Sequence, residues 1–120
     1  MGLDIWFCKR KESQLGYFRK VNFLVAYFAD LGFDVENQTP LTITKADAEI
    51  LLDRCKQVLS DNSKAEELLP TMSGFFFGST EYDEYYFEDV EEVANFVENE
   101  LIPAFDNLGS DEEITFETWY

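Results

Sequence analysis

Histidine is missing from the whole chain, and Lys and Arg are missing from its last 56 residues. That segment, residues 65–120, nevertheless carries sixteen Asp and Glu side chains, whereas nine basic and nine acidic residues balance over residues 1–64. The net charge of −16 therefore resides in the C-terminal half of the chain. Because a phosphate backbone is bound by Lys and Arg, this half excludes direct nucleic-acid binding. Without His the commonest general base is absent, so we do not expect an enzyme.

Cysteine and long apolar runs are also scarce. Cys8 and Cys55 are the only cysteines, and two cysteines neither build a disulfide framework nor show metal-ligand spacing. We expect reduced, buried thiols, no metal and no cofactor. The most apolar stretch, residues 21–29, is too short to span a bilayer, and the first residues do not resemble a signal peptide. The expected location is the cytoplasm, with no membrane partner.

Aromatic residues, in contrast, are abundant and make up 17% of the chain. Twelve Phe, six Tyr and two Trp are more than an acidic disordered tail contains, so the acidic half should fold. A chain of 120 residues has room for one hydrophobic core. We therefore expect a single domain over residues 1–120.

The hydrophobic pattern predicts three long helices. Apolar side chains recur at three- and four-residue spacing over residues 15–31, 45–59 and 87–102. Gly32 is the expected C-cap of the first helix, which is apolar on more than one side and should be the most buried. Thr44, followed three residues later by Asp47, predicts a capping box on the second. Pro103 should end the third.

Two terminal segments have the composition of strands. Residues 3–8 (LDIWFC) and 114–120 (ITFETWY) are rich in β-branched and aromatic side chains. Residues 65–69 suggest a short additional helical turn before a proline. The predicted fold is α+β, a small antiparallel sheet with the N- and C-terminal strands paired and three helices packed on it.

Carboxylates crowd the third predicted helix without any Lys or Arg between them. Each like-charge pair on one face costs about 0.2–0.5 kcal/mol. The helix dipole favours acids near the N-terminus and disfavours those near the C-terminus. A solvated face that keeps the protein soluble and a surface that binds a basic partner both fit this pattern. The candidate partner-binding residues are Glu88, Asp89, Glu91, Glu92, Glu98 and Glu100.

The stretch LLPTMSGFFFGSTEYDEYY, residues 68–86, is the most distinctive part of the chain. With the aromatic-Arg-Lys-x-Asn motif at residues 17–22 and the opening Gly2-Leu3-Asp4, it resembles a family of small proteins found in phages and bacterial genomes. The resemblance extends to about residue 97 and implies a phage or prophage context, but no reaction. The chain also carries no Walker-type Gly-rich loop.

Residues 73–86 form a strand–turn–helix junction in this prediction, with GFFFG (74–78) either a short strand or a buried loop. Such junctions commonly contact ligands. The hydroxyls of Ser79 and Thr80 could instead cap a turn or a helix. Arg19 either pairs with Asp83 or Glu81 or clamps a ligand. The alternative ligand-binding residues are Arg19, Asn22, Ser79, Thr80, Tyr82 and Asp83.

Two hypotheses of function follow. The first is an acidic interaction protein that inhibits a basic host protein or nucleoprotein complex, as an anti-defence protein or a nucleic-acid mimic. The second is a small-ligand or nucleotide-binding module at the junction. An exposed acidic face without a deep pocket would favour the first, and a concave site lined by Arg19 and Asp83 would favour the second. The oligomeric state does not follow from the sequence.

Overall fold

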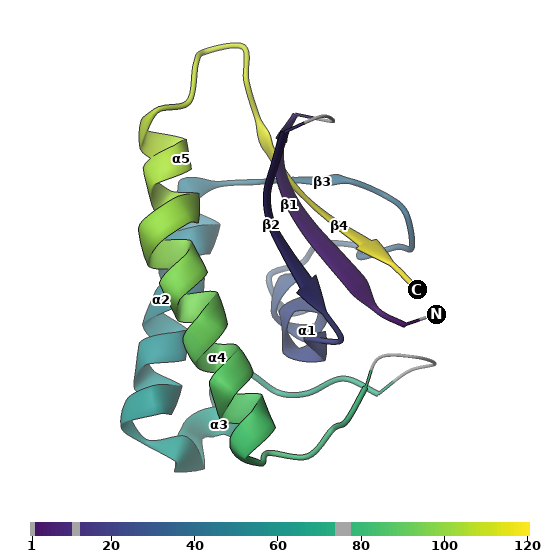
Figure 1. The fold of residues 1–120 in the computed structure, drawn as a ribbon, viewed down its shortest axis with the longest axis vertical. Coiled ribbons are helices and arrows are strands. Elements are labelled where there is room, and N and C mark those ends of the chain that lie inside the picture. Colours follow the sequence, from purple (N-terminus) through teal and green to yellow (C-terminus); the bar gives the residue numbers. More distant parts are fainter. Residues whose placement is uncertain (1, 11–12, 74–77) are drawn as a thin grey trace.

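The computed structural model describes residues 2–10, 13–73 and 78–120. Within them an antiparallel sheet of four strands, in the order β2-β1-β4-β3, is combined with helices (Figure 1). The strands are β1 (Asp4–Arg10), β2 (Ser13–Arg19), β3 (Leu41–Ile43) and β4 (Ile114–Trp119). The α-helices are α1 (Asn22–Asp30), α2 (Lys45–Ser60), α3 (Ala65–Leu68), α4 (Glu84–Phe96) and α5 (Ile102–Asp106). A 3₁₀ turn, η1 (Asn62–Lys64), precedes α3, and a π-helical turn, η2 (Val97–Leu101), joins α4 to α5.

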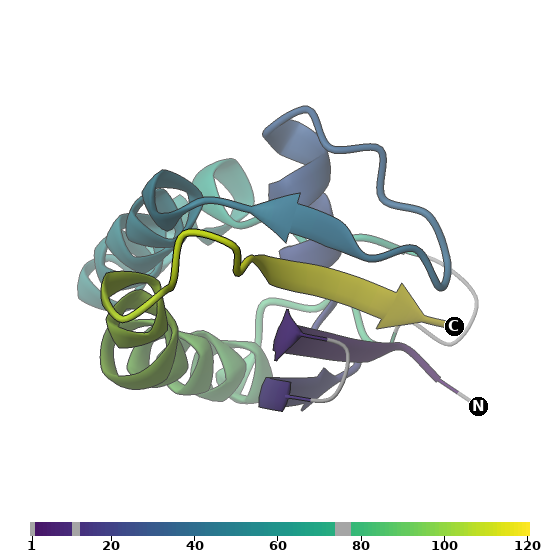
Figure 2. The same cartoon turned by 90° about the horizontal axis from the view of Figure 1, so that it is seen from above.

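The predicted pairing of the terminal strands is confirmed. Strands β1 and β4 run antiparallel, with Asp4 opposite Trp119 and Cys8 opposite Thr115. The two ends of the chain consequently lie side by side in both views (Figures 1 and 2). The α+β class is therefore correct, and β4 occupies the middle of the sheet between β1 and β3.

The helix predicted over residues 15–31 is wrong in its first part. Residues Ser13–Arg19 form β2, which pairs with β1 as a hairpin, and the helix begins only at Asn22. Lys20 separates the two elements with a positive φ of 59°, a left-handed conformation that no helix interior accommodates. Tertiary pairing with β1 thus overrides a local apolar spacing that a helix and a strand can share.

Other boundaries also differ from the prediction. Strand β3 was not predicted, because three residues are too few for a period to show. Pro103 does not end the third helix, which continues to Asp106 as α5. The π turn η2 comes directly before α5, so Pro103 falls in a first helical turn, where a missing N–H does no harm. The strand considered for residues 74–78 lies outside the described residues, apart from Gly78.

Both predicted helix caps are confirmed. The Thr44 Oγ1 accepts a hydrogen bond from Asp47 N at 3.2 Å, and Asp47 Oδ2 accepts one from Thr44 N at 2.9 Å. At the end of α1, Gly32 has a φ of 100°. Its N–H donates to Ala29 O, and Phe33 N donates to Phe28 O, which together form a Schellman motif.

The helices lie on one side of the sheet, and the core fills the space between them (Figures 1 and 2). Side chains of α1 from Asn22 to Phe28 are all buried, which confirms α1 as the most buried helix. No helix in the described part of the chain covers the opposite face of the sheet. Cys55 is buried as expected, whereas Cys8 is only half buried because it points to that open face. None of the described helices combines the length and apolarity needed to cross a bilayer.

Candidate functional site

Helix α4 begins with an acidic cap. The Asp83 Oδ1 accepts a hydrogen bond from Tyr86 N at 3.1 Å, and Glu84 stands in the first turn. Both carboxylates are stabilised by the partial positive charge of the helix N-terminus. The opposite side of α4 buries Val90, Val93 and other apolar residues against the core. This burial fixes which side chains of the helix face the solvent.

The predicted acidic row extends along α4 and the π turn η2. Glu88, Glu91, Glu92, Glu98 and Glu100 are exposed, and Asp89 is half buried. Helix α2 packs beside α4 and supplies the cations nearest to the row. Lys56 Nζ lies 3.3 Å from Glu98 Oε2, and Lys45 Nζ lies 2.7 Å from Asp106 Oδ1.

Within the row, Lys56 pairs with Glu98 near the C-terminal end, whereas Asp106, the partner of Lys45, lies beyond the row. In the described part of the chain, no ion pair reaches Glu88, Glu91 or Glu92. The N-terminal half of α4 therefore presents uncompensated negative charge to the solvent.

A second feature lies where residues 17–22 meet the 68–86 stretch. The buried Asn22 donates from Nδ2 to Ser79 O at 2.9 Å and accepts at Oδ1 from Met72 N at 3.0 Å. It thereby fastens the segments on either side of residues 74–77 to the start of α1. Thr71 N donates to Tyr82 Oη at 3.1 Å, and Thr71 Oγ1 donates to Thr80 O at 3.0 Å. Asn22 and Tyr82 thus hold the junction together.

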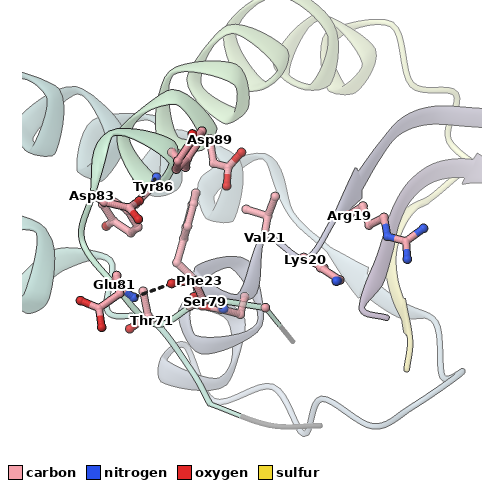
Figure 3. Close-up of a pocket in the computed structure, with 13 residues that line it drawn as sticks. Arg19, Lys20, Val21, Phe23, Thr71, Ser79, Glu81, Asp83, Tyr86 and Asp89 are labelled. Atoms are coloured by element: carbon pink, nitrogen blue, oxygen red, sulfur yellow. Dashed lines mark hydrogen bonds between the residues drawn. The ribbon is translucent and has the colours of Figure 1, made fainter. Parts of the chain in front are cut away.

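A pocket of about 260 Å³ opens at this junction (Figure 3). Its wall combines residues 19–23, Thr71, Gly78, Ser79, Glu81 and the first turns of α4. The pocket therefore brings together two motifs that lie some fifty residues apart in the sequence. The lining residues are Arg19, Lys20, Val21, Asn22, Phe23, Thr71, Gly78, Ser79, Glu81, Asp83, Tyr85, Tyr86 and Asp89.

The structure brings together only part of the predicted ligand-binding set. Asn22, Ser79 and Asp83 line the pocket, whereas Thr80 and Tyr82 do not. Ser79 Oγ accepts a hydrogen bond from Glu81 N at 3.0 Å, which confirms the predicted capping of a turn. Arg19 borders the pocket, but its guanidinium points away from Asp83 in Figure 3.

Charge is distributed unevenly around the pocket. Asp83 and Asp89 line it at the start of α4, and Lys20 lines it on the opposite side (Figure 3). Burial, together with the charges of the neighbouring Glu92, Glu88 and Asp83 carboxylates, raises the pKa of Asp89 to about 6. Asp89 is thus the one member of the acidic row that also lines the pocket.

Sequence reasoning missed the floor of this pocket and its lysine. Val21 and Phe23 belong to an apolar run that signals only core, and Lys20 stands out in the sequence only as part of a motif. Lys20 and Gly78 both have a positive φ, and a Cβ at position 78 would lie 3.0 Å from Lys20 Cβ, a proximity that no local pattern encodes. Among the described residues, no group of three or more His, Cys, Asp or Glu side chains is placed to hold a metal ion.

Comparison with known proteins identified no similar protein. No family model, no curated protein and no solved structure matches the chain. The function is therefore argued from the geometry.

Proposed function

We propose that this protein acts by binding a basic partner protein through the acidic surface of α4. The single observation that carries the proposal is the exposed, uncompensated charge of Glu88, Glu91 and Glu92. These carboxylates are same-face neighbours that repel one another by about 0.2–0.5 kcal/mol per pair, a cost that a cationic partner would relieve. A net charge of −16 would also steer such a partner toward the surface.

The resemblance to phage and prophage proteins supports a partner in the bacterial host. A row of carboxylates on a rigid helix can occupy a surface that otherwise binds nucleic-acid phosphates. The protein would then inhibit a host nucleic-acid-binding or defence complex by competition, without contacting nucleic acid itself.

A charge-neutral variant tests this proposal. The triple substitution Glu88→Gln, Glu91→Gln and Glu92→Gln keeps shape and helix propensity while removing three charges. A partner captured from host lysate and purified should associate with the variant at least tenfold more slowly at low salt, because steering depends on these charges. The difference should shrink as salt rises.

A matched variant controls for net charge alone. Glu49→Gln, Glu66→Gln and Glu67→Gln remove the same charge from exposed positions on α2 and α3. Association of this control should stay near that of the unmodified protein. Equal slowing of both variants would show a non-specific charge effect, and unchanged binding by the α4 variant would refute the proposal.

The pocket supports a second candidate function, the binding of a small ligand. The observation that favours it is the placement of Asp83 and Asp89 on one side of the pocket and Lys20 on the other, with the apolar Val21 and Phe23 between them. A ligand that placed an ammonium group near the two carboxylates and an anionic group near Lys20 would pair with the charges on both sides of the pocket. A nucleotide fits less well, since Glu81 and the two aspartates would face its phosphates.

Backbone NMR titration separates these ligand classes. Free L-lysine and L-glutamate, as zwitterions, should shift amide signals of residues 20–23 and 83–89, whereas AMP should not. Asp89→Asn should weaken the shift at neutral pH. Asp83→Asn retains the capping oxygen of α4 and so tests the charge without removing the cap. If millimolar ligand shifted none of these amide signals, the small-ligand hypothesis would be refuted.

A further inference from the structure

The open face of the sheet carries a regular pattern of aromatic and acidic side chains. Side chains alternate along β4, with Ile114, Phe116 and Thr118 buried and the residues between them turned outward. The register places Trp119 opposite Asp4, and Trp6 opposite Glu117. Two indoles and two carboxylates therefore alternate over adjacent positions of β1 and β4. We call this four-residue arrangement the indole–carboxylate patch.

One more aromatic side chain extends the patch onto β2. Tyr17 is opposite Trp6, and their ring centroids are 5.4 Å apart. Trp6 and Trp119 meet edge to face at 5.9 Å. Tyr17 and Trp119 remain 43% and 46% exposed, so both rings are accessible from the solvent.

Hydrogen bonds hold the patch in place. The Tyr17 hydroxyl donates to Asp4 Oδ1, and Trp119 Nε1 donates to Glu117 Oε2, each at 2.5 Å. These bonds orient the rings while leaving further carboxylate lone pairs for another donor. Burial of the thiol and the nearby Glu117 charge both raise the pKa of Cys8, which lies on the same open face.

The negative charge of the patch restricts which kind of group can bind there. Arg19 faces Asp4 across the β1–β2 pair, so the Asp4 charge is partly balanced. Glu117 has no ion pair within the described chain. A second copy of the protein would bring another −16 against this face, and a nucleic acid would bring phosphates against Glu117. A cationic group is the complementary occupant.

We propose that the indole–carboxylate patch binds an arginine side chain of a basic partner peptide, with the guanidinium stacked on an indole and bonded to Glu117. A guanidinium is planar, stacks on aromatic faces and donates several hydrogen bonds in one plane, which matches an indole beside a carboxylate. Lysine offers a point charge and no flat surface to stack. The patch lies on a different element from the α4 surface and does not depend on it.

The protein provides its own reporter for this site. Trp6 and Trp119 are the only two tryptophans, so selectively excited tryptophan fluorescence reports on the patch. Titration with a short peptide of alternating glycine and arginine should give a saturable fluorescence change. The matching lysine peptide should bind about threefold or more weakly, and a citrulline peptide, which keeps the shape without the charge, should bind at least tenfold more weakly.

Variants then locate the contact. Glu117→Gln, and Trp119→Leu with Trp6 as the remaining fluorophore, should each weaken arginine-peptide binding by about two- to fivefold. Circular dichroism confirms that each variant is folded. The glutamine triple variant of α4 should keep the response, which separates this site from the one under Proposed function. Equal affinity for the arginine and citrulline peptides, tighter binding of single-stranded DNA, or self-association that quenches the tryptophans without peptide would each overturn the proposal.

Discussion

Position 16 in β2 has space only for a glycine. A Cβ there would lie 2.4 Å from the ring of Phe96, which is itself confined by Phe7 at 5.2 Å and Phe18 at 5.3 Å between ring centroids. A confined ring cannot move away cheaply in a close-packed core. A single hydrogen atom in place of a side chain thus lets α4 approach the sheet.

Gly16→Ala should therefore lower the free energy of unfolding by about 1–3 kcal/mol, the usual cost of overpacking. Urea unfolding followed by circular dichroism measures the change. Gly109→Ala is the control, because its Cβ would meet carboxylate oxygens, Glu112 Oε1 at 3.0 Å and Asp111 Oδ1 at 3.5 Å, rather than a ring confined in the core. We expect that control to stay within about 0.5 kcal/mol of the unmodified protein. If the Gly16→Ala variant were as stable as the control, the Phe96 ring would have to move aside at little cost, which would contradict the prediction.

Asp89 should make stability depend on pH in an unusual direction. Its pKa of about 6 in the folded protein lies above the ordinary value of 3.8. Between these values the folded protein binds more protons than the unfolded chain, so this group lowers stability as pH rises through the window. Asp89→Asn should raise the free energy of unfolding by about 1 kcal/mol at pH 7.5, because solvent screens part of the effect. Near pH 3.5 it should leave the free energy of unfolding unchanged.

Urea unfolding of both proteins at the two pH values checks this, because the titration of all other groups cancels in the difference. Asp34→Asn, at an exposed site outside the pocket, serves as the matched substitution. A gain from Asp89→Asn that is equal at both pH values would contradict the raised pKa.

At the level of elements, helices α2 and α4 each begin directly after a residue whose side chain caps them. The capping box of α2 satisfies two backbone N–H groups reciprocally. Thr44→Ala should lower the free energy of unfolding by about 1 kcal/mol, and Thr44→Ser, which keeps the hydroxyl, should recover most of it. Thermal unfolding of the three proteins provides the comparison. Equal losses in both variants would assign the effect to the methyl group instead.

The sequence predicted those elements whose signals are local. Capping residues, the Gly32 terminus and the dense β-formers of residues 114–120 identified α2, the end of α1 and β4. The β2 strand was not identified because its apolar spacing also fits a helix, and only pairing with β1 decides between them. The glycine at position 16 and the aromatic residues beside it were the available hint.

The candidate site was predictable to a smaller extent. The acidic row could be identified because charge is visible in the sequence, and its glutamates are exposed as a helical pattern requires, whereas Asp89 is half buried. The pocket depends on which segments meet in space, so Lys20, Val21 and Phe23 gave no sign of lining it. The indole–carboxylate patch was equally hidden, since it follows from the register between two strands at opposite ends of the chain.

For the whole molecule, net charge should determine how salt affects stability. The molecule measures 40 × 31 × 22 Å, so at about 0.01 M salt, with a Debye length of about 30 Å, nearly all its charges interact. At 0.15 M the length falls to about 8 Å and the self-repulsion of −16 is largely screened. The urea midpoint should rise over this range, and it should rise less for the α4 glutamine variant. A midpoint that falls with added salt would mean that attractive pairs outweigh the repulsion.

The central place of β4 has a consequence for synthesis on the ribosome. Strands β1 and β3 are both complete by residue 43, yet their shared partner begins only at Ile114. At about 5–20 residues per second, the seventy intervening residues take roughly 4–14 s to translate. During that interval the β1 edge that later pairs with β4 stays unpaired, and the hairpin presents its apolar side to the cell. The nascent chain is therefore most exposed to misassociation before β4 emerges, and the sheet closes as one of the last events of folding.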